Sequence, residues 1–77
     1  MILRNLLSKL KWKKENAIIE IIHREGKKEL IKRIELKDVT YIGKGHFEYG
    51  KNETYIPFHR IKRIVKDGLI IWEKSGD

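Results

Sequence analysis

Beyond residue 15, the chain is a series of short apolar segments, rich in β-branched side chains, that alternate with glycine-bearing turns. Residues 17–22 are dense in isoleucine and too short for a second helix, which predicts a strand buried on most of both faces. Asp67-Gly68 separates residues 61–66 from residues 69–74, the pattern of a hairpin with a two-residue turn. Strands are also predicted at residues 30–36 (with Leu30, Ile34 and Leu36 inward), where a helix is the alternative, and at residues 46–49 and 54–56. The sequence therefore predicts some five or six mainly antiparallel strands, in a sheet or a partly open barrel.

The first residues have a different apolar spacing. Leucines at positions 3, 6, 7 and 10 form one stripe of an amphipathic helix, and the basic residues of this segment fall off the stripe. The helix could pack its leucines into the core, lie on a membrane surface or a partner, or be a cleaved transit segment. The preference for lysine over arginine argues against the transit segment. With the strands that follow, the helix predicts an α+β fold.

The length of 77 residues limits the chain to a single domain, residues 1–77, with a small core. It excludes a dinucleotide-binding fold and a barrel of eight βα units. Because cysteine is absent, disulfides and thiolate-bound metals are excluded as well. The longest uncharged apolar run, residues 69–72, is far shorter than the roughly 20 residues that span a bilayer. We therefore expect a soluble, cytoplasmic protein.

The positive charge of the chain is segregated. The net charge is +7, from 18 basic and 11 acidic residues. Residues 1–14 hold five basic residues and residues 54–66 hold four, with no acidic residue in either segment, so the remainder is slightly acidic. This distribution is typical of a surface that binds a polyanion. Abundant Lys, Glu and Ile with no Gln are also typical of a thermophile, but heat adaptation does not segregate charges by sign.

Two parts of the chain resemble each other. Ile34, Val39 and Ile42 align at a fixed offset with apolar residues of a second copy, Ile56, Ile61 and Ile64. Each copy predicts a strand, a tight turn and a second strand. In this alignment Lys37-Asp38 occupies the position of His59-Arg60.

The dipeptides His23-Arg24 and His59-Arg60 include two of the three histidines. Arginine matches phosphate oxygens with a planar pair of donors, and imidazole can donate to a phosphate or a ribose oxygen. Together the two dipeptides could clamp a terminal phosphate. Alternatively, each arginine pairs with a nearby carboxylate and each histidine only ends a strand. Strand alternation would place His23 and Arg24 on opposite faces.

The second dipeptide precedes an acid-free segment, which favours binding over a purely structural role. The residues expected to follow an RNA backbone are Lys62, Arg63 and Lys66 with the N-terminal lysines Lys11, Lys13 and Lys14. The candidates for stacking on bases are Tyr55 and Phe58.

Catalysis is a second hypothesis. His23 and His59 could act as an acid and base pair in phosphodiester cleavage, because imidazole titrates near neutrality. The sequence places no carboxylate or hydroxyl to orient either histidine, so we assign no catalytic residue. The three histidines lack the close spacings of a metal site, and we expect neither a metal nor a cofactor.

Residues 55–61 (Tyr-Ile-Pro-Phe-His-Arg-Ile), followed by Ile64, Gly68 and residues 71–72, carry a more specific signal. With Trp12 ending the leucine helix and the strand end His23-Arg24, they resemble a small, largely archaeal family. Formerly an uncharacterised family, it is now called the RNA cyclic group end recognition domain.

The resemblance covers essentially the whole chain and implies recognition of RNA ends, such as those with a 2′,3′-cyclic phosphate. Relatives are fused to RNA-end enzymes, which implies an RNA-processing enzyme as a second candidate partner. His59, Arg60 and Arg24 match the family pattern, whereas Lys13-Lys14 and Glu25-Gly26 depart from it. Three hypotheses follow: an RNA-end-binding module, a small His-dependent phosphodiesterase or cyclic-phosphate hydrolase, and an adaptor domain that binds an acidic protein.

Overall fold

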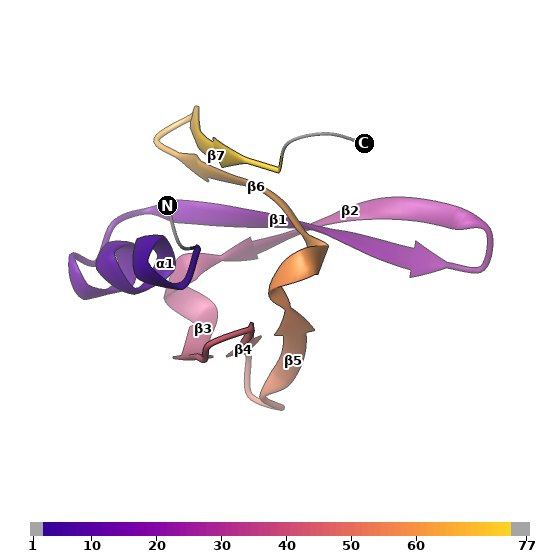
Figure 1. The fold of residues 1–77 in the computed structure, drawn as a ribbon, viewed down its shortest axis with the longest axis horizontal. Helices are drawn as coiled ribbons and strands as arrows, with labels where there is room; N and C mark the ends of the chain where they lie inside the picture. Colours follow the sequence, from indigo (N-terminus) through magenta and orange to yellow (C-terminus); the bar gives the residue numbers. More distant parts are fainter. Residues whose placement is uncertain (1–2, 75–77) are drawn as a thin grey trace.

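The computed structural model describes residues 3–74, which form one α-helix and two antiparallel sheets (Figure 1). The helix is α1 (Leu3–Trp12). The four-stranded sheet has the order β2-β1-β6-β7, with β1 (Ala17–Glu25), β2 (Lys28–Glu35), β6 (Ile61–Lys66) and β7 (Leu69–Glu73). The three-stranded sheet has the order β3-β4-β5, with β3 (Val39–Ile42), β4 (His46–Tyr49) and β5 (Thr54–Pro57). The α+β prediction is confirmed, but the described residues hold seven strands in two sheets and no closed barrel.

The leucine stripe of α1 packs into the core, as the first interpretation of this helix requires. Leu7 and Leu10 are buried, and Leu3 and Leu6 pack against the core from its edge. The helix ends in a Schellman motif, in which the Glu15 N–H donates to the Leu10 carbonyl at 3.0 Å. Lys14 takes the left-handed conformation of this motif, with a φ of 56°, where glycine is usual. No helix in the described part of the chain is long and apolar enough to cross a membrane.

Two 3₁₀ turns carry the chain from one sheet to the other. The turn η1 (Leu36–Asp38) links β2 to β3, and η2 (Phe58–Arg60) links β5 to β6. In each turn the N–H of the residue that follows donates to the carbonyl of the first turn residue. The repeat predicted from the sequence is therefore a repeat of structure: strand, 3₁₀ turn, strand.

The core lies where the two sheets and α1 meet. A β-bulge between β1 and β6 offsets the strands at Glu20 and Ile21. Ile61 and Ile64, three residues apart, would face opposite sides of a regular strand, yet both are fully buried. Because of the bulge, β6, a strand of only six residues, directs both Ile61 and Ile64 into the core.

The β1–β2 hairpin extends beyond the core, on the side away from α1 (Figure 1). Gly26 forms its turn with a φ of 65°. The prediction for Ile34 and Leu36 is confirmed, since both are buried, but Leu30 is 44% exposed. Leu30 pairs with His23 near the turn of the hairpin, in a stretch of β2 whose residues 28–33 are all exposed.

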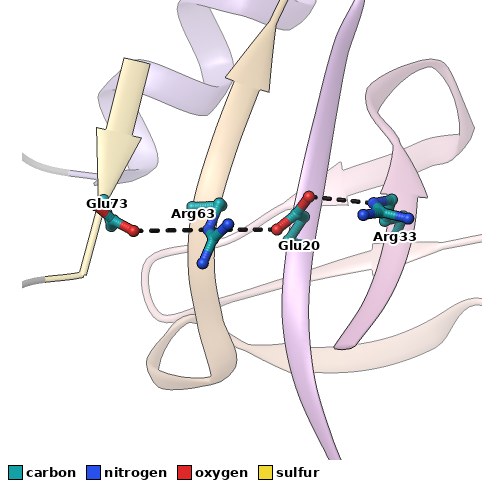
Figure 2. Close-up of polar contacts among 4 residues, drawn as sticks. All are labelled: Glu20, Arg33, Arg63 and Glu73. Atoms are coloured by element: carbon teal, nitrogen blue, oxygen red, sulfur yellow. Dashed lines mark hydrogen bonds and ion pairs between the residues drawn. The ribbon is translucent and has the colours of Figure 1, made fainter. Parts of the chain in front are cut away.

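A row of alternating charges crosses the four-stranded sheet (Figure 2). Glu73, Arg63, Glu20 and Arg33 are opposite one another in the strand register. Glu20 is buried, and its carboxylate lies 3.3 Å from Nε of Arg63 and 3.1 Å from Nε of Arg33. Glu73 and Arg33 at the ends of the row are largely exposed. A buried charge that loses its counter-ion destabilises the fold, whereas an exposed charge that loses its counter-ion costs little. The stabilising contribution of the row therefore comes mainly from the buried Glu20 at its centre.

Glu20→Ala should lower the free energy of unfolding by about 3 kcal/mol, because it leaves Arg63 without its closest counter-ion in a half-buried position. Glu73→Ala removes a carboxylate from the exposed end of the same row and should cost less than about 1 kcal/mol. Urea unfolding of the two variants measures the difference. Equal losses would show that burial of Glu20 does not set the strength of the row.

Candidate functional site

Three separate elements meet at a cationic hollow of about 340 Å³ beside η2. It is lined by Ile22 and Arg24 of β1, His59 and Arg60 of η2, and Lys74, which follows β7. We call this site the cationic hollow. It brings together three of the four residues of the two His-Arg dipeptides and adds a lysine.

Local structure explains why these side chains converge. Ile22 and Arg24 are two residues apart on β1 and share one face of the strand. In η2, Phe58 packs against the core, and His59 and Arg60 are left exposed. The β6–β7 pairing continues past β7, because the Lys74 N–H donates to the Lys62 carbonyl at 2.8 Å. Lys74 then reaches back to η2, where its Nζ donates to the His59 carbonyl at 2.8 Å.

The hollow carries an excess of positive charge. Arg24 is paired with Glu29, with 3.0 Å between Nη2 and Oε2, but both side chains are more than half exposed. Such an exposed pair contributes little stability, so an anion can displace Glu29 at small cost. Within residues 3–74, neither Arg60 nor Lys74 forms an ion pair. The chemistry available is that of an anion site, with two guanidinium groups, one ammonium and one imidazole.

His23 lies outside the hollow. It stands between Ile22 and Arg24 on β1, so strand alternation directs it to the opposite face, as expected from the sequence. The two histidines of the catalytic hypothesis therefore do not flank one site. Among residues 3–74, no group of three or more His, Asp or Glu side chains is arranged to hold a metal ion.

The basic residues of β6 lie outside the cationic hollow, and two of them form ion pairs within the fold. Arg63 belongs to the charged row of Figure 2, and Nζ of Lys66 lies 3.1 Å from a carboxylate oxygen of Glu15. Lys62 is half-buried and does not line the hollow. A role for these three residues along an RNA backbone stays a prediction.

The remaining predicted residues lie elsewhere. Lys11 and Lys14 line a groove beside the end of α1, and Lys13 is exposed next to them. Phe58 packs against the core, whereas Tyr55 is 60% exposed and stacks on His46. The N-terminal lysines therefore do not line the cationic hollow.

Lys74 was not predicted from the sequence, although a signal for it existed. The tight turn at Asp67-Gly68 pairs β6 with β7, and this pairing, with one register shift between Ile64 and Val65, brings Lys74 opposite Lys62 near the start of β6. The predicted hairpin included Lys74 but did not identify it as a site residue.

The fold and the hollow define a small two-sheet module that presents a cationic site at a corner between its sheets. The chain belongs to the family of the MJ1316 RNA cyclic group end recognition domain, whose model matches residues 1–74. This confirms the resemblance found in the sequence.

Similar proteins come from archaea of the genera Thermococcus and Pyrococcus. A UPF0248 protein of Thermococcus sibiricus is 38% identical, over 95% of this chain and 85% of that protein. The UPF0248 protein PH1212.1 of Pyrococcus horikoshii is 38% identical, over 91% and 86% of the two chains. The UPF0248 protein TK0315 of Thermococcus kodakarensis is 39% identical, over 91% and 88%. No solved structure matches the chain significantly.

Proposed function

We propose that this chain is a non-catalytic RNA-binding module that holds the phosphate of an RNA end, such as a 2′,3′-cyclic phosphate, in the cationic hollow. The observation that carries the proposal is the convergence of Arg24, Arg60 and Lys74, three cations from three elements, beside His59. The description of the family, RNA cyclic group end recognition, supports the same class of ligand.

Each side chain has a distinct part in this proposal. Arg24 and Arg60 supply paired donors for phosphate oxygens, and Lys74 supplies a compact positive charge. His59 donates to a phosphate or ribose oxygen of the terminal nucleotide. The equivalent turn η1 carries Lys37 and Asp38, so the repeat places an acidic residue where η2 has Arg60. The anion site is therefore proposed for the second turn alone.

Binding rather than cleavage is favoured because His59 is the histidine of the hollow and His23 is directed to the other face of β1. General acid and base catalysis would need a second group within hydrogen-bond reach of the same phosphate. An RNA-processing enzyme, the second partner that the sequence resemblance implies, would then carry out any chemistry on the bound end. Turnover of a cyclic-phosphate oligonucleotide by the protein alone would contradict the non-catalytic role.

Affinity should depend on the chemistry of the RNA end. Oligonucleotides of one sequence, ending in a 2′,3′-cyclic phosphate, a 3′-phosphate or a hydroxyl, are titrated in parallel. The phosphate-bearing ends should bind more tightly, and the difference should shrink as salt is added. Equal affinities for all three ends would contradict end recognition. Salt-insensitive binding to an acidic protein with no affinity for RNA would favour the adaptor hypothesis.

Arg60→Ala should weaken binding of a phosphate-ended oligonucleotide by about 1–3 kcal/mol, the range for a charge-assisted contact. Lys51→Ala is the matched control, because it also removes one exposed positive charge but lies in the turn between β4 and β5. Fluorescence anisotropy with a labelled oligonucleotide measures both. Equal losses in the two variants would indicate a general charge effect rather than a contact in the hollow.

Glu29→Gln should strengthen binding of the same oligonucleotide about two- to fivefold, because it frees Arg24 from an exposed pair that contributes less than about 1 kcal/mol. The effect should vanish in the Arg24→Ala background, where there is no arginine to release. Asp67→Asn, in the turn between β6 and β7, controls for the loss of one exposed negative charge. If Glu29→Gln and Asp67→Asn strengthen binding equally, the pairing with Arg24 is not responsible.

A further inference from the structure

A row of aromatic rings crosses the exposed face of the three-stranded sheet, one ring from each strand. The ring centroid of His46 on β4 lies 5.5 Å from that of Tyr41 on β3 and 4.2 Å from that of Tyr55 on β5. Tyr41 is 53% exposed and Tyr55 is 60% exposed, while Phe47 and Ile56 on the other face of the same sheet are buried. The sheet therefore covers the core with one face and presents rings on the other.

The central ring of the row is held in place. Nε2 of His46 lies 3.0 Å from Oε2 of Glu48, and the imidazole stacks on Tyr55 at an interplanar angle of 20°. Gly43, in the turn before β4, gives the rings their space. A Cβ at this position would lie 2.9 Å from Cε1 of His46 and 3.1 Å from Cε2 of Tyr41. Glycine at position 43 therefore leaves room for the rings of His46 and Tyr41.

The row continues toward α1. Trp12, the last residue of this helix, is 85% exposed and lines a groove of about 560 Å³ together with Tyr41. Lys11 and Lys14 line the same groove. Nζ of Lys11 is held beside it by the carbonyls of Leu36 and Lys37, at 3.3 and 3.4 Å.

We propose that Trp12, Tyr41 and Tyr55 stack on unpaired bases of single-stranded RNA, with His46 as the supporting ring between the two tyrosines and Lys11 and Lys14 beside the phosphates. We call these four rings the aromatic row. Exposed aromatic rings with lysines at their side are the combination that binds single-stranded nucleic acid, because every base has a face that stacks on a ring. The choice of RNA rests on the proposed function, but none of the four rings lines the cationic hollow.

The charges around the row set the direction of the RNA backbone. Glu48 is opposite both Tyr41 and Tyr55 in the strand register, and it lines a hollow with Glu53, Thr40 and Tyr41. Lys11 and Lys14 line a separate groove with Trp12 and Tyr41. Phosphates would be repelled by the carboxylates of the hollow and attracted by the lysines of the groove. The bases therefore lie over the rings, with the backbone along the end of α1.

The fluorescence of Trp12 gives a direct test. The protein is titrated with a hydroxyl-ended single-stranded oligonucleotide and with an abasic oligomer of the same length and end. Trp12→Phe serves as the background, because it removes the reporter and leaves Trp72. We expect saturable quenching of Trp12 by the base-bearing oligomer and none by the abasic one. Equal quenching by both, or no quenching while the oligomer binds, would overturn the proposal.

Variants separate the aromatic row from the cationic hollow. Tyr55→Ala and Tyr41→Ala should each weaken binding of the base-bearing oligomer about fivefold or more, and Tyr55→Leu should not restore it. Leu69→Ala, which removes another exposed apolar side chain, should leave it unchanged. Arg60→Ala should keep the quenching and lose the preference for a phosphate end. If the tyrosine variants bind as tightly as the unaltered protein while the preference for a phosphate end is normal, the stacking proposal is contradicted and the phosphate site in the cationic hollow is supported. If neither the hydroxyl-ended nor the phosphate-ended oligomer binds, both fail.

Discussion

The two 3₁₀ turns are the constraint on which the rest of this small domain depends. A chain of this length buries few side chains, and a flat sheet would leave one face of each strand without a partner. By turning at η1 and η2, the chain places Ile34, Val39, Ile56 and Ile61 around one core between two sheets. The bulge opposite Glu20 adds Ile64 to the same core, so one short strand supplies two buried side chains.

The second turn also explains why the candidate site lies where it does. A 3₁₀ turn of three residues cannot bury all of its side chains, and in η2 the inward position is taken by Phe58. His59 and Arg60 must then face outward, at the junction where β1 and the end of β7 pass. In η1 the inward residue is Leu36, and the two outward residues are Lys37 and Asp38. One backbone geometry therefore occurs twice, and the proposed anion site depends on the outward side chains of the second copy.

The sequence predicts the local elements of this protein well and their assembly less well. The leucine spacing of α1, the hairpin at Asp67-Gly68 and the repeat all depend on neighbours in the chain, which a sequence displays directly. The split into two sheets depends on how strands far apart in the sequence pair, and the bulge at Glu20 exists only in that pairing. For the same reason, Arg63 resembles a free cation in the sequence and becomes a counter-ion of Glu20 in the fold. Arg60 is exposed in the fold because it lies in a turn, where no adjacent strand places a side chain opposite it.

The cationic hollow and the aromatic row share one structural support. Tyr55 lies on β5, and β5 runs directly into η2 with His59 and Arg60. Between them, Ile56 is buried and Phe58 packs against the core, so the inward side chains of this segment anchor its outward ones. A shift of β5 that moved the ring of Tyr55 would also displace the turn that carries Arg60. Because packing holds both positions through one short segment, the spacing between the aromatic row and the cationic hollow is fixed by the core rather than by flexible surface side chains.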